Sequence, residues 1–265
     1  MQAVCAANDG RVPSHRHVGC SLAFAGLFHG EAPPARRFRE GVSLARASGC
    51  EAVQLDAMAT GMRAKDLDRS GRRELAAILK REGLSLSGID LWIPSEHYAD
   101  KARMDRALEA FREACGLAAE VARLVEAPSP TVSVTLPPKT TVELVDAVVR
   151  PAMATGVQIA DFNRYEDRIA GILGEGFDPG GIILAGGDAN MSVVASTRGM
   201  IDARLTDATR HSRCIVGRGE LDVTAYRATL ESLGMVRWVT VDVRSMIDPV
   251  RAAREAVEAW RTIPR

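Results

Sequence analysis

The sequence lacks an excess of charge of either sign. Its 265 residues carry 34 lysines and arginines against 34 aspartates and glutamates, so the formal net charge is zero. Proteins that bind the phosphate backbone of nucleic acids usually have a basic excess, so we expect no nucleic-acid partner. The sequence also has no apolar run close to the roughly 20 residues that span a bilayer, so we expect no membrane association.

Cysteine is scarce and dispersed. The five cysteines, at positions 5, 20, 50, 115 and 214, include no CxxC pair. This pattern argues against a zinc ribbon and against a disulfide framework, and it predicts reduced thiols in a cytoplasmic protein. The first 17 residues lack the apolar block of a signal peptide, so we expect residues 1–17 to form a flexible N-terminal arm and residues 18–265 to form one domain.

Several signatures of catalysis and cofactor binding are missing as well. There is no GxSxG elbow, no HExxH pair and no P-loop, which removes the sequence support for a serine hydrolase, a zincin or an NTPase. No GxGxxG follows the first apolar run, although an open doubly wound sheet would carry one there to bind a dinucleotide.

The chain instead alternates short apolar runs, typical of strands, with runs of helical periodicity. We expect strands at 18–24, 52–56, 84–93, 131–136, 157–162, 176–178, 201–205 and 238–243. We expect helices at 36–48, 71–82, 104–123, 141–154, 165–173, 181–197, 223–233 and 248–261. Asp248 is the expected N-cap of the last helix, with Pro249 in its first turn. Eight consecutive strand–helix units predict parallel strands that close into a single (β/α)8 TIM barrel, an α/β fold.

Acidic residues recur where the expected strands end. Asp178 follows strand six within the stretch GFDPGGIILAGGD, and comparable ends occur at 161–163, 204–207 and 241–244. Catalytic groups of TIM barrels come from the C-terminal ends of the strands, so we expect a ligand pocket there. Two alternatives remain open at this point: Asp178 could serve as a turn residue, and Asp242 could pair with Arg244.

Further candidates for the pocket lie at the ends of the first three strands or in the loops after them. They are His29 after strand one, Asp56 at the end of strand two, Asp90 in strand three, and Trp92, Glu96 and His97 near the end of strand three or after it. The Trp92 ring offers the flat apolar face that sugar rings favour. Solvent exposure is the alternative for both histidines. The turn at 217–219 could face a phosphate or be a simple loop.

Five motifs together carry a family resemblance: GVQIA at 156–160, FDPGG with LAGGD at 177–188, RLTD at 204–207, GRGELD at 217–222 and WVTVD at 238–242. Through them the sequence resembles the xylose-isomerase-like TIM-barrel superfamily, which includes sugar phosphate isomerases and epimerases and the AP endonuclease 2 family. The histidines that the endonuclease branch requires are too few here. The resemblance therefore favours the sugar isomerases and epimerases.

The resemblance implies one divalent cation, Mn²⁺, Mg²⁺ or Co²⁺, held by a glutamate of strand five, an aspartate and a nearby histidine at strand six, a histidine of strand seven and a glutamate of strand eight. In this sequence those positions hold Phe162, Asp178 with Gly181, Arg204 and Asp242. Only Asp178 and Asp242 remain as metal-facing or acid/base carboxylates, so the metal site is expected to be partly lost. Arg204 would bind an anionic group instead.

These observations give two functional hypotheses. The first is a sugar isomerase/epimerase-like protein that acts on a small sugar or hydroxy-carbonyl compound, with Asp178 and Asp242 as the catalytic residues. The alternative is a non-catalytic barrel that binds a carbohydrate-like or anionic ligand or a protein partner. The resemblance also implies a homodimer or a homotetramer.

Overall fold

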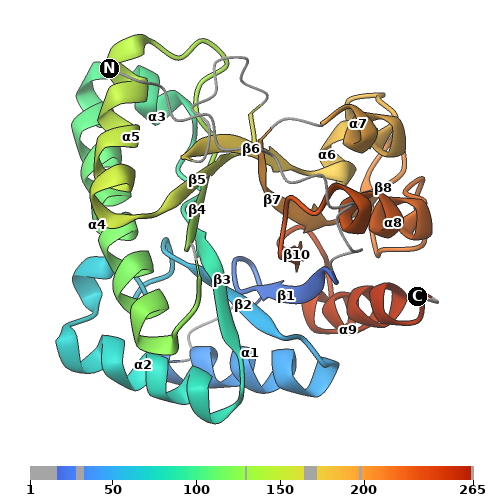
Figure 1. Ribbon diagram of the computed structural model, residues 1–265, viewed down its shortest axis with the longest axis horizontal. Coiled ribbons are helices and arrows are strands. Elements are labelled where there is room, and N and C mark those ends of the chain that lie inside the picture. The colour runs from blue at the N-terminus through green and yellow to red at the C-terminus, as the bar shows by residue number, and fades with distance from the viewer. Residues whose placement is uncertain (1–16, 28–32, 129, 164–171, 197–198, 264–265) are drawn as a thin grey trace, which may run out of the picture.

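The computed structural model describes residues 17–27, 33–128, 130–163, 172–196 and 199–263. Its parallel strands close into a barrel in the order β1-β10-β7-β6-β5-β4-β3-β2 (Figure 1). The barrel strands are β1 Gly19–Ala23, β2 Ala52–Asp56, β3 Ser85–Asp90, β4 Thr131–Val134, β5 Gln158–Asp161, β6 Leu173–Phe177, β7 Met200–Leu205 and β10 Trp238–Val241. The predicted TIM barrel is confirmed.

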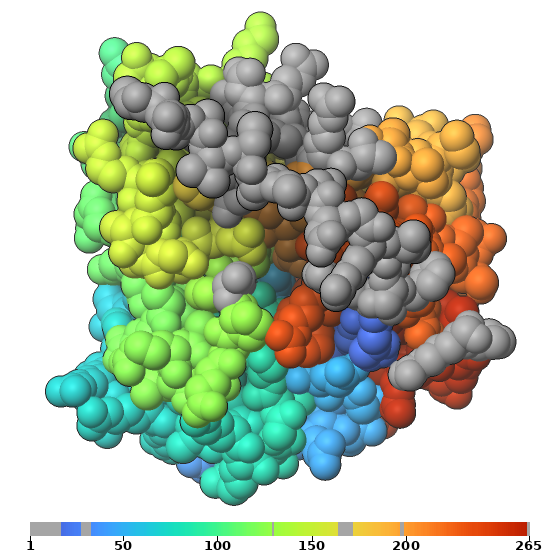
Figure 2. All heavy atoms as spheres, in the orientation of Figure 1, coloured from blue at the N-terminus to red at the C-terminus, as the bar shows by residue number. Residues whose placement is uncertain are grey.

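Helices surround the barrel. They are α1 Pro34–Ser48, α2 Arg69–Arg81, α3 Glu96–Ala99, α4 Lys101–Val125, α5 Val142–Thr155, α6 Pro179–Leu184, α7 Ala189–Ala195, α8 Val223–Leu233 and α9 Pro249–Arg261, with the 3-10 turn η1 at Ala64–Asp66. In the face shown in Figure 2, α5 lies on one side and α6 to α8 on the opposite side. No helix among the described residues combines the length and apolar character that a bilayer crossing requires.

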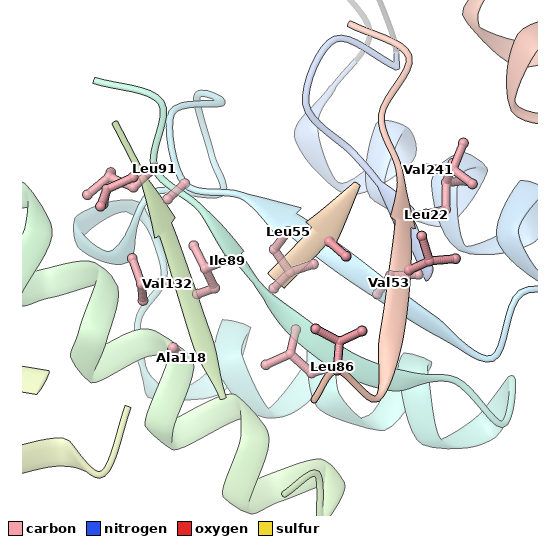
Figure 3. Close-up of a cluster of buried hydrophobic side chains, with 14 of the residues drawn as sticks. Leu22, Val53, Leu55, Leu86, Ile89, Leu91, Ala118, Val132 and Val241 are labelled. Carbon is pink, nitrogen blue, oxygen red and sulfur yellow. The ribbon is translucent and has the colours of Figure 1, made fainter. Parts of the chain in front are cut away.

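The strands bury apolar side chains under this helical layer. Leu22, Val53, Ile89, Val132 and Val241 are each at most 1% exposed. Figure 3 shows Ile89 and Val132 over the part of α4 that carries Ala118. Successive side chains of a strand point to opposite faces, so the residues between these apolar positions point into the barrel.

Local signals explain most helix boundaries. The side chain of Asp248 accepts a hydrogen bond from the Arg251 backbone N–H, which confirms the predicted cap of α9. Helix α1 ends at Gly49, which adopts a left-handed φ of 82°. A residue with a β-carbon would be strained in this conformation. Helix α9 therefore begins, and helix α1 ends, where the sequence predicts, whereas α1 begins two residues earlier than expected.

Three expectations need correction. Strand six begins at Leu173, so the helix expected at 165–173 does not reach that residue, and residues 164–171 lie outside the described part. The helix expected at 181–197 is divided into α6 and α7 at Gly186–Gly187, and Asp188 caps α7 by accepting from Met191 N–H. A hairpin of β8 Asp207–Ala208 and β9 Arg213–Cys214 was not predicted, because strands of two residues leave no periodic signal.

Candidate functional site

The interior of the barrel is polar. Gln54 of β2 donates a hydrogen bond to Asp202 of β7 at 3.0 Å, and Ser133 of β4 donates to the same carboxylate oxygen at 2.8 Å. Thr240 of β10 donates to its other oxygen at 3.3 Å. Strands β2, β4 and β7 are not neighbours, so these side chains meet inside the barrel. The layer replaces the branched apolar side chains usual in TIM barrels.

Above this layer, four charged side chains form what we call the rim cluster: Asp90, Arg204, Asp242 and Arg244. Arg204 Nη1 lies 3.0 Å from Asp242 Oδ2, and Arg204 Nη2 lies 3.4 Å from Asp90 Oδ1. Arg244 pairs with the same two carboxylates, through Nη2 to Asp90 and through Nε to Asp242 at 3.0 Å. The pair between Asp242 and Arg244 that the sequence left open is therefore present.

The rim cluster is buried unevenly. The side chain of Arg204 is 11% exposed and that of Arg244 is 28% exposed, whereas the two carboxylates are at most 4% exposed. Burial raises the pKa of Asp90 even though two guanidinium groups face it. At Asp242 burial acts in the same direction, but the charges of Arg204 and Arg244 outweigh it and lower the pKa.

Phe162, which follows β5, holds Arg204 from one side. The guanidinium carbon lies 3.9 Å from the centre of the Phe162 ring, a cation–π contact. The Arg204 Nε atom is buried and has no hydrogen-bond partner among the described residues. The aromatic ring of Phe162 therefore stacks on the Arg204 guanidinium of the rim cluster.

Asp178, at the end of β6, forms a second ion pair. Its carboxylate accepts hydrogen bonds from Arg213 of the hairpin at 2.5 and 3.1 Å and from the Thr206 hydroxyl at 2.5 Å. A β-carbon at Gly181 would lie 2.9 Å from Asp178 Oδ2 and 3.5 Å from an Arg213 nitrogen. Glycine at the position expected for a histidine therefore leaves room for the Asp178–Arg213 pair.

The charges of the rim cluster and of the Asp178–Arg213 pair affect each other's pKa values. Burial alone would raise the pKa of Asp178, but the hydrogen bonds and charge of Arg213, with a contribution from Arg204, lower it to about 2. Asp242 and Arg244 in turn affect the pKa of Arg213. A cleft of about 470 Å³ opens beside Asp178, with Phe162, Glu175 and Ile182 in its lining.

Replacing Arg213 by alanine is expected to raise the pKa of Asp178, because only the charge of Arg204 and the Thr206 hydrogen bond would then oppose the effect of burial. In the native protein the lowered pKa contributes about 2 kcal/mol of stability, from a shift of 3.8 to about 2. That contribution is complete above the unfolded pKa and is lost as the pH falls towards 2. An NMR titration of the Asp178 carboxyl carbon measures the shift.

Arg251→Ala is the matched control for this titration. It removes an exposed arginine that pairs with Glu255 on helix α9 and has no contact with Asp178 among the described ion pairs. The Asp178 titration should be unchanged in this variant. A low Asp178 pKa retained in Arg213→Ala would contradict the assignment of Arg213 as its counterion.

The remaining predicted residues divide between the rim and the helical layer. Asp56 accepts hydrogen bonds from the Trp92 indole at 3.1 Å and from Met58 N–H at 2.8 Å. The predicted residues Asp56 and Trp92 therefore lie together. Glu96 and His97 are part of α3, where His97 bonds Arg103 of α4 at 3.0 Å and lines a cleft of the helical layer. His29 lies outside the described residues.

Sequence reasoning missed Arg213, the partner of Asp178, and it named Asp90 as a pocket candidate without its partner Arg204. Asp90 and Arg213 are charged residues whose partners are 114 and 35 positions away in the sequence. The turn at 217–219 binds a carboxylate of the protein itself: Gly217 N–H and Gly219 N–H both donate hydrogen bonds to Asp207. These donors are therefore not directed at a phosphate.

The side chains of the described strand ends do not fit a divalent cation. No group of three or more His, Cys, Asp or Glu side chains within the described ranges is arranged to hold a metal. Asp178 and Asp242, the two expected ligands, are each paired with arginine. The guanidinium of Arg204 is a fixed positive charge, which would repel a metal ion, and Phe162 supplies no donor atom.

No family model and no curated protein matches the chain. Solved structures do match. An L-ribulose 3-epimerase has a TM-score of 0.68 and 15% identity, covering 92% of this chain and 96% of its own. A sugar phosphate isomerase/epimerase from Parabacteroides distasonis has a TM-score of 0.66 and 10% identity, with 98% and 99% covered. A xylose isomerase domain containing protein from Salmonella typhimurium has a TM-score of 0.60 and 12% identity, with 92% and 98% covered.

The chain has the xylose-isomerase-like TIM-barrel fold. This confirms, at the level of the fold, the resemblance carried by the five motifs. At such identities the likeness extends to the barrel and not to the reaction. In this xylose-isomerase-like barrel, the rim cluster and the Asp178–Arg213 pair lie at the strand ends, where TIM barrels carry their active sites.

Proposed function

We propose that this protein is a sugar isomerase/epimerase-like barrel that takes a small acidic sugar derivative or hydroxy-carbonyl compound at the C-terminal end of its strands. The observation that carries the proposal is the grouping of Arg204, Arg213 and Arg244 around the strand ends. Guanidinium groups bind carboxylates and phosphates through paired hydrogen bonds. The solved structures of similar fold include an L-ribulose 3-epimerase, which supports a sugar-like ligand.

Two of these arginines retain donors for a ligand. The described contacts of Arg213 use its two terminal nitrogens, and those of Arg244 use Nε and Nη2. Arg213 Nε and Arg244 Nη1 remain, on side chains that are 25% and 28% exposed. A cleft of about 470 Å³, within the usual range for small-molecule sites, lies beside Asp178, although none of the three arginines is among its lining residues.

A non-catalytic binder of the same ligand class is the second candidate. Isomerisation and epimerisation both need a base that takes a proton from carbon. Asp178 and Asp242 have lowered pKa values, which makes their carboxylates weak bases. This observation favours binding without turnover, whereas the fold favours the enzyme.

Calorimetric titration with D-gluconate and D-fructose is expected to show binding of the acid and much weaker binding of the neutral sugar. Arg244→Gln should weaken D-gluconate binding about tenfold, the effect of one charge-assisted hydrogen bond. Arg251→Gln, at an exposed position, should leave it unchanged. Equal binding of both compounds, or a stoichiometric Mn²⁺ ion that is lost in Asp178→Ala, would contradict the proposed site.

Proton exchange distinguishes the two candidates. An isomerase or epimerase exchanges a carbon-bound hydrogen of its substrate with solvent in D₂O, which proton NMR detects as a lost signal. If the protein is an enzyme, we expect its substrate to exchange this hydrogen. If no bound sugar acid or sugar phosphate exchanges a hydrogen, the protein is the non-catalytic binder.

A further inference from the structure

A cleft on the helical layer, formed by η1, α3 and α4, has an apolar floor. Its volume is about 520 Å³, and it is separate from the rim cluster. Met58, Leu91 and Ile93 line it from the loops after β2 and β3. The facing side of α4 contributes Ala107 and Ala110, whose methyl groups leave space that a longer side chain would fill.

The edge of this cleft is mainly basic. Arg63 and Arg103 are already paired, with Asp66 at 2.6 Å and with Asp100 at 3.3 Å. Lys65 and Arg106 have no ion pair among the described residues, and both are exposed. The acidic residues of the edge are Glu109, which pairs with Arg112, and Glu113. Within the part of the chain that the structure describes, two cations and one carboxylate, Glu113, line this edge without an ion pair.

From these features we infer that the η1–α3–α4 cleft is a second ligand site, for a small amphipathic carboxylate. The apolar side chains that line the cleft would pack against an alkyl or aromatic group of the ligand. Lys65 and Arg106 lie at the solvent-exposed edge, where they can pair with the carboxylate of the ligand. The volume lies within the range of small-molecule pockets, which are mostly apolar with a few placed polar groups.

Titration of the full-length protein with octanoate, followed by amide NMR and calorimetry, tests the inference. We expect one octanoate per chain, with shifts in the residues of η1 and in the first half of α4. Octan-1-ol, which lacks the charge, should bind at least about tenfold more weakly, as should octanoate to Arg106→Gln. Ala110→Phe should fill the floor and abolish binding without lowering the melting temperature.

Two control variants test whether octanoate binding depends on this cleft. Arg123→Gln changes an exposed arginine of the same helix outside the cleft, and Arg244→Gln changes the rim cluster. Octanoate affinity should be unchanged in both. Binding that is absent, or equal in Arg106→Gln, Ala110→Phe and the unmodified protein, would overturn the inference. Dimerisation that Ala110→Phe prevents, without octanoate binding, would assign the cleft to a second copy of the chain and also overturn it.

Discussion

Replacing Arg204 by alanine is expected to lower the free energy of unfolding by about 3–5 kcal/mol, because it leaves buried carboxylates without one of their two cations. Arg204 lies 3.0 Å from Asp242 and 3.4 Å from Asp90, and its side chain is only 11% exposed. The stacked ring of Phe162 also loses its partner. Urea unfolding at pH 7 measures the loss.

The pH dependence of this loss distinguishes charge from packing. The pKa of Asp242 is lowered in the native protein, so the stability that it contributes is present at neutral pH and disappears on acidification. The difference between Arg204→Ala and the unmodified protein should therefore narrow as the pH falls. Arg251→Ala removes an arginine that is 60% exposed and should cost less than about 1 kcal/mol. A similar cost for both variants would show that the rim cluster contributes no more than a surface pair.

The barrel was predictable because its signals are local. Strand β2 and helix α8 have the bounds expected from the sequence, and α9 begins after its predicted cap. Each depends on periodicity within one element and on capping or turn residues beside it. Strand β6 was predicted too short, because Gly174 and Gly176 interrupt the apolar run. A β-carbon at Gly174 would clash with the Gly199 carbonyl oxygen, so packing between neighbouring strands sets that composition.

The site was predictable only in part, because its contacts join distant segments. The position of Asp178 and Asp242 at strand ends follows from the strand–helix pattern. The sequence also left open the pair of Asp242 with Arg244, which lie two positions apart, and this pair is present. The Asp178–Arg213 and Asp90–Arg204 pairs were not predicted, since Arg213 belongs to the unpredicted hairpin and Arg204 reaches Asp90 across the barrel from β7 to β3. No spacing in the sequence encodes these pairs.

The residues that stand at the expected metal-binding positions are mutually consistent in the structure. Arg204 needs a neighbour that tolerates a guanidinium, and Phe162 offers its ring face at 3.9 Å. Arg213 needs space beside Asp178, and Gly181 provides it. Phe162 therefore supports Arg204, and Gly181 leaves room for the Asp178–Arg213 pair. This pattern indicates a rim organised around arginine–aspartate pairs rather than a metal site with unrelated losses.

The carboxylate of Asp207 joins the hairpin that carries Arg213 to the loop that follows it. This side chain accepts hydrogen bonds from Ala208 N–H at 2.8 Å, Gly217 N–H at 3.0 Å, Gly219 N–H at 2.8 Å and Leu221 N–H at 3.0 Å. Asp207 is 1% exposed. The GRGELD motif thus wraps its backbone around Asp207, which places β9, and with it Arg213, beside Asp178.

Replacing Asp207 by alanine is therefore expected to cost about 3 kcal/mol, because several buried donors lose a charged acceptor at once. Hydrogen exchange should show lost protection at the amides of Gly217, Gly219 and Leu221. Asp222→Ala in the same motif is the control, since it removes only the N-cap of α8, worth about 1 kcal/mol, and should leave those amides protected. Unfolding in urea gives the energies. Unchanged exchange in Asp207→Ala would show that the loop keeps its shape without the carboxylate, and Arg213 would then need another support.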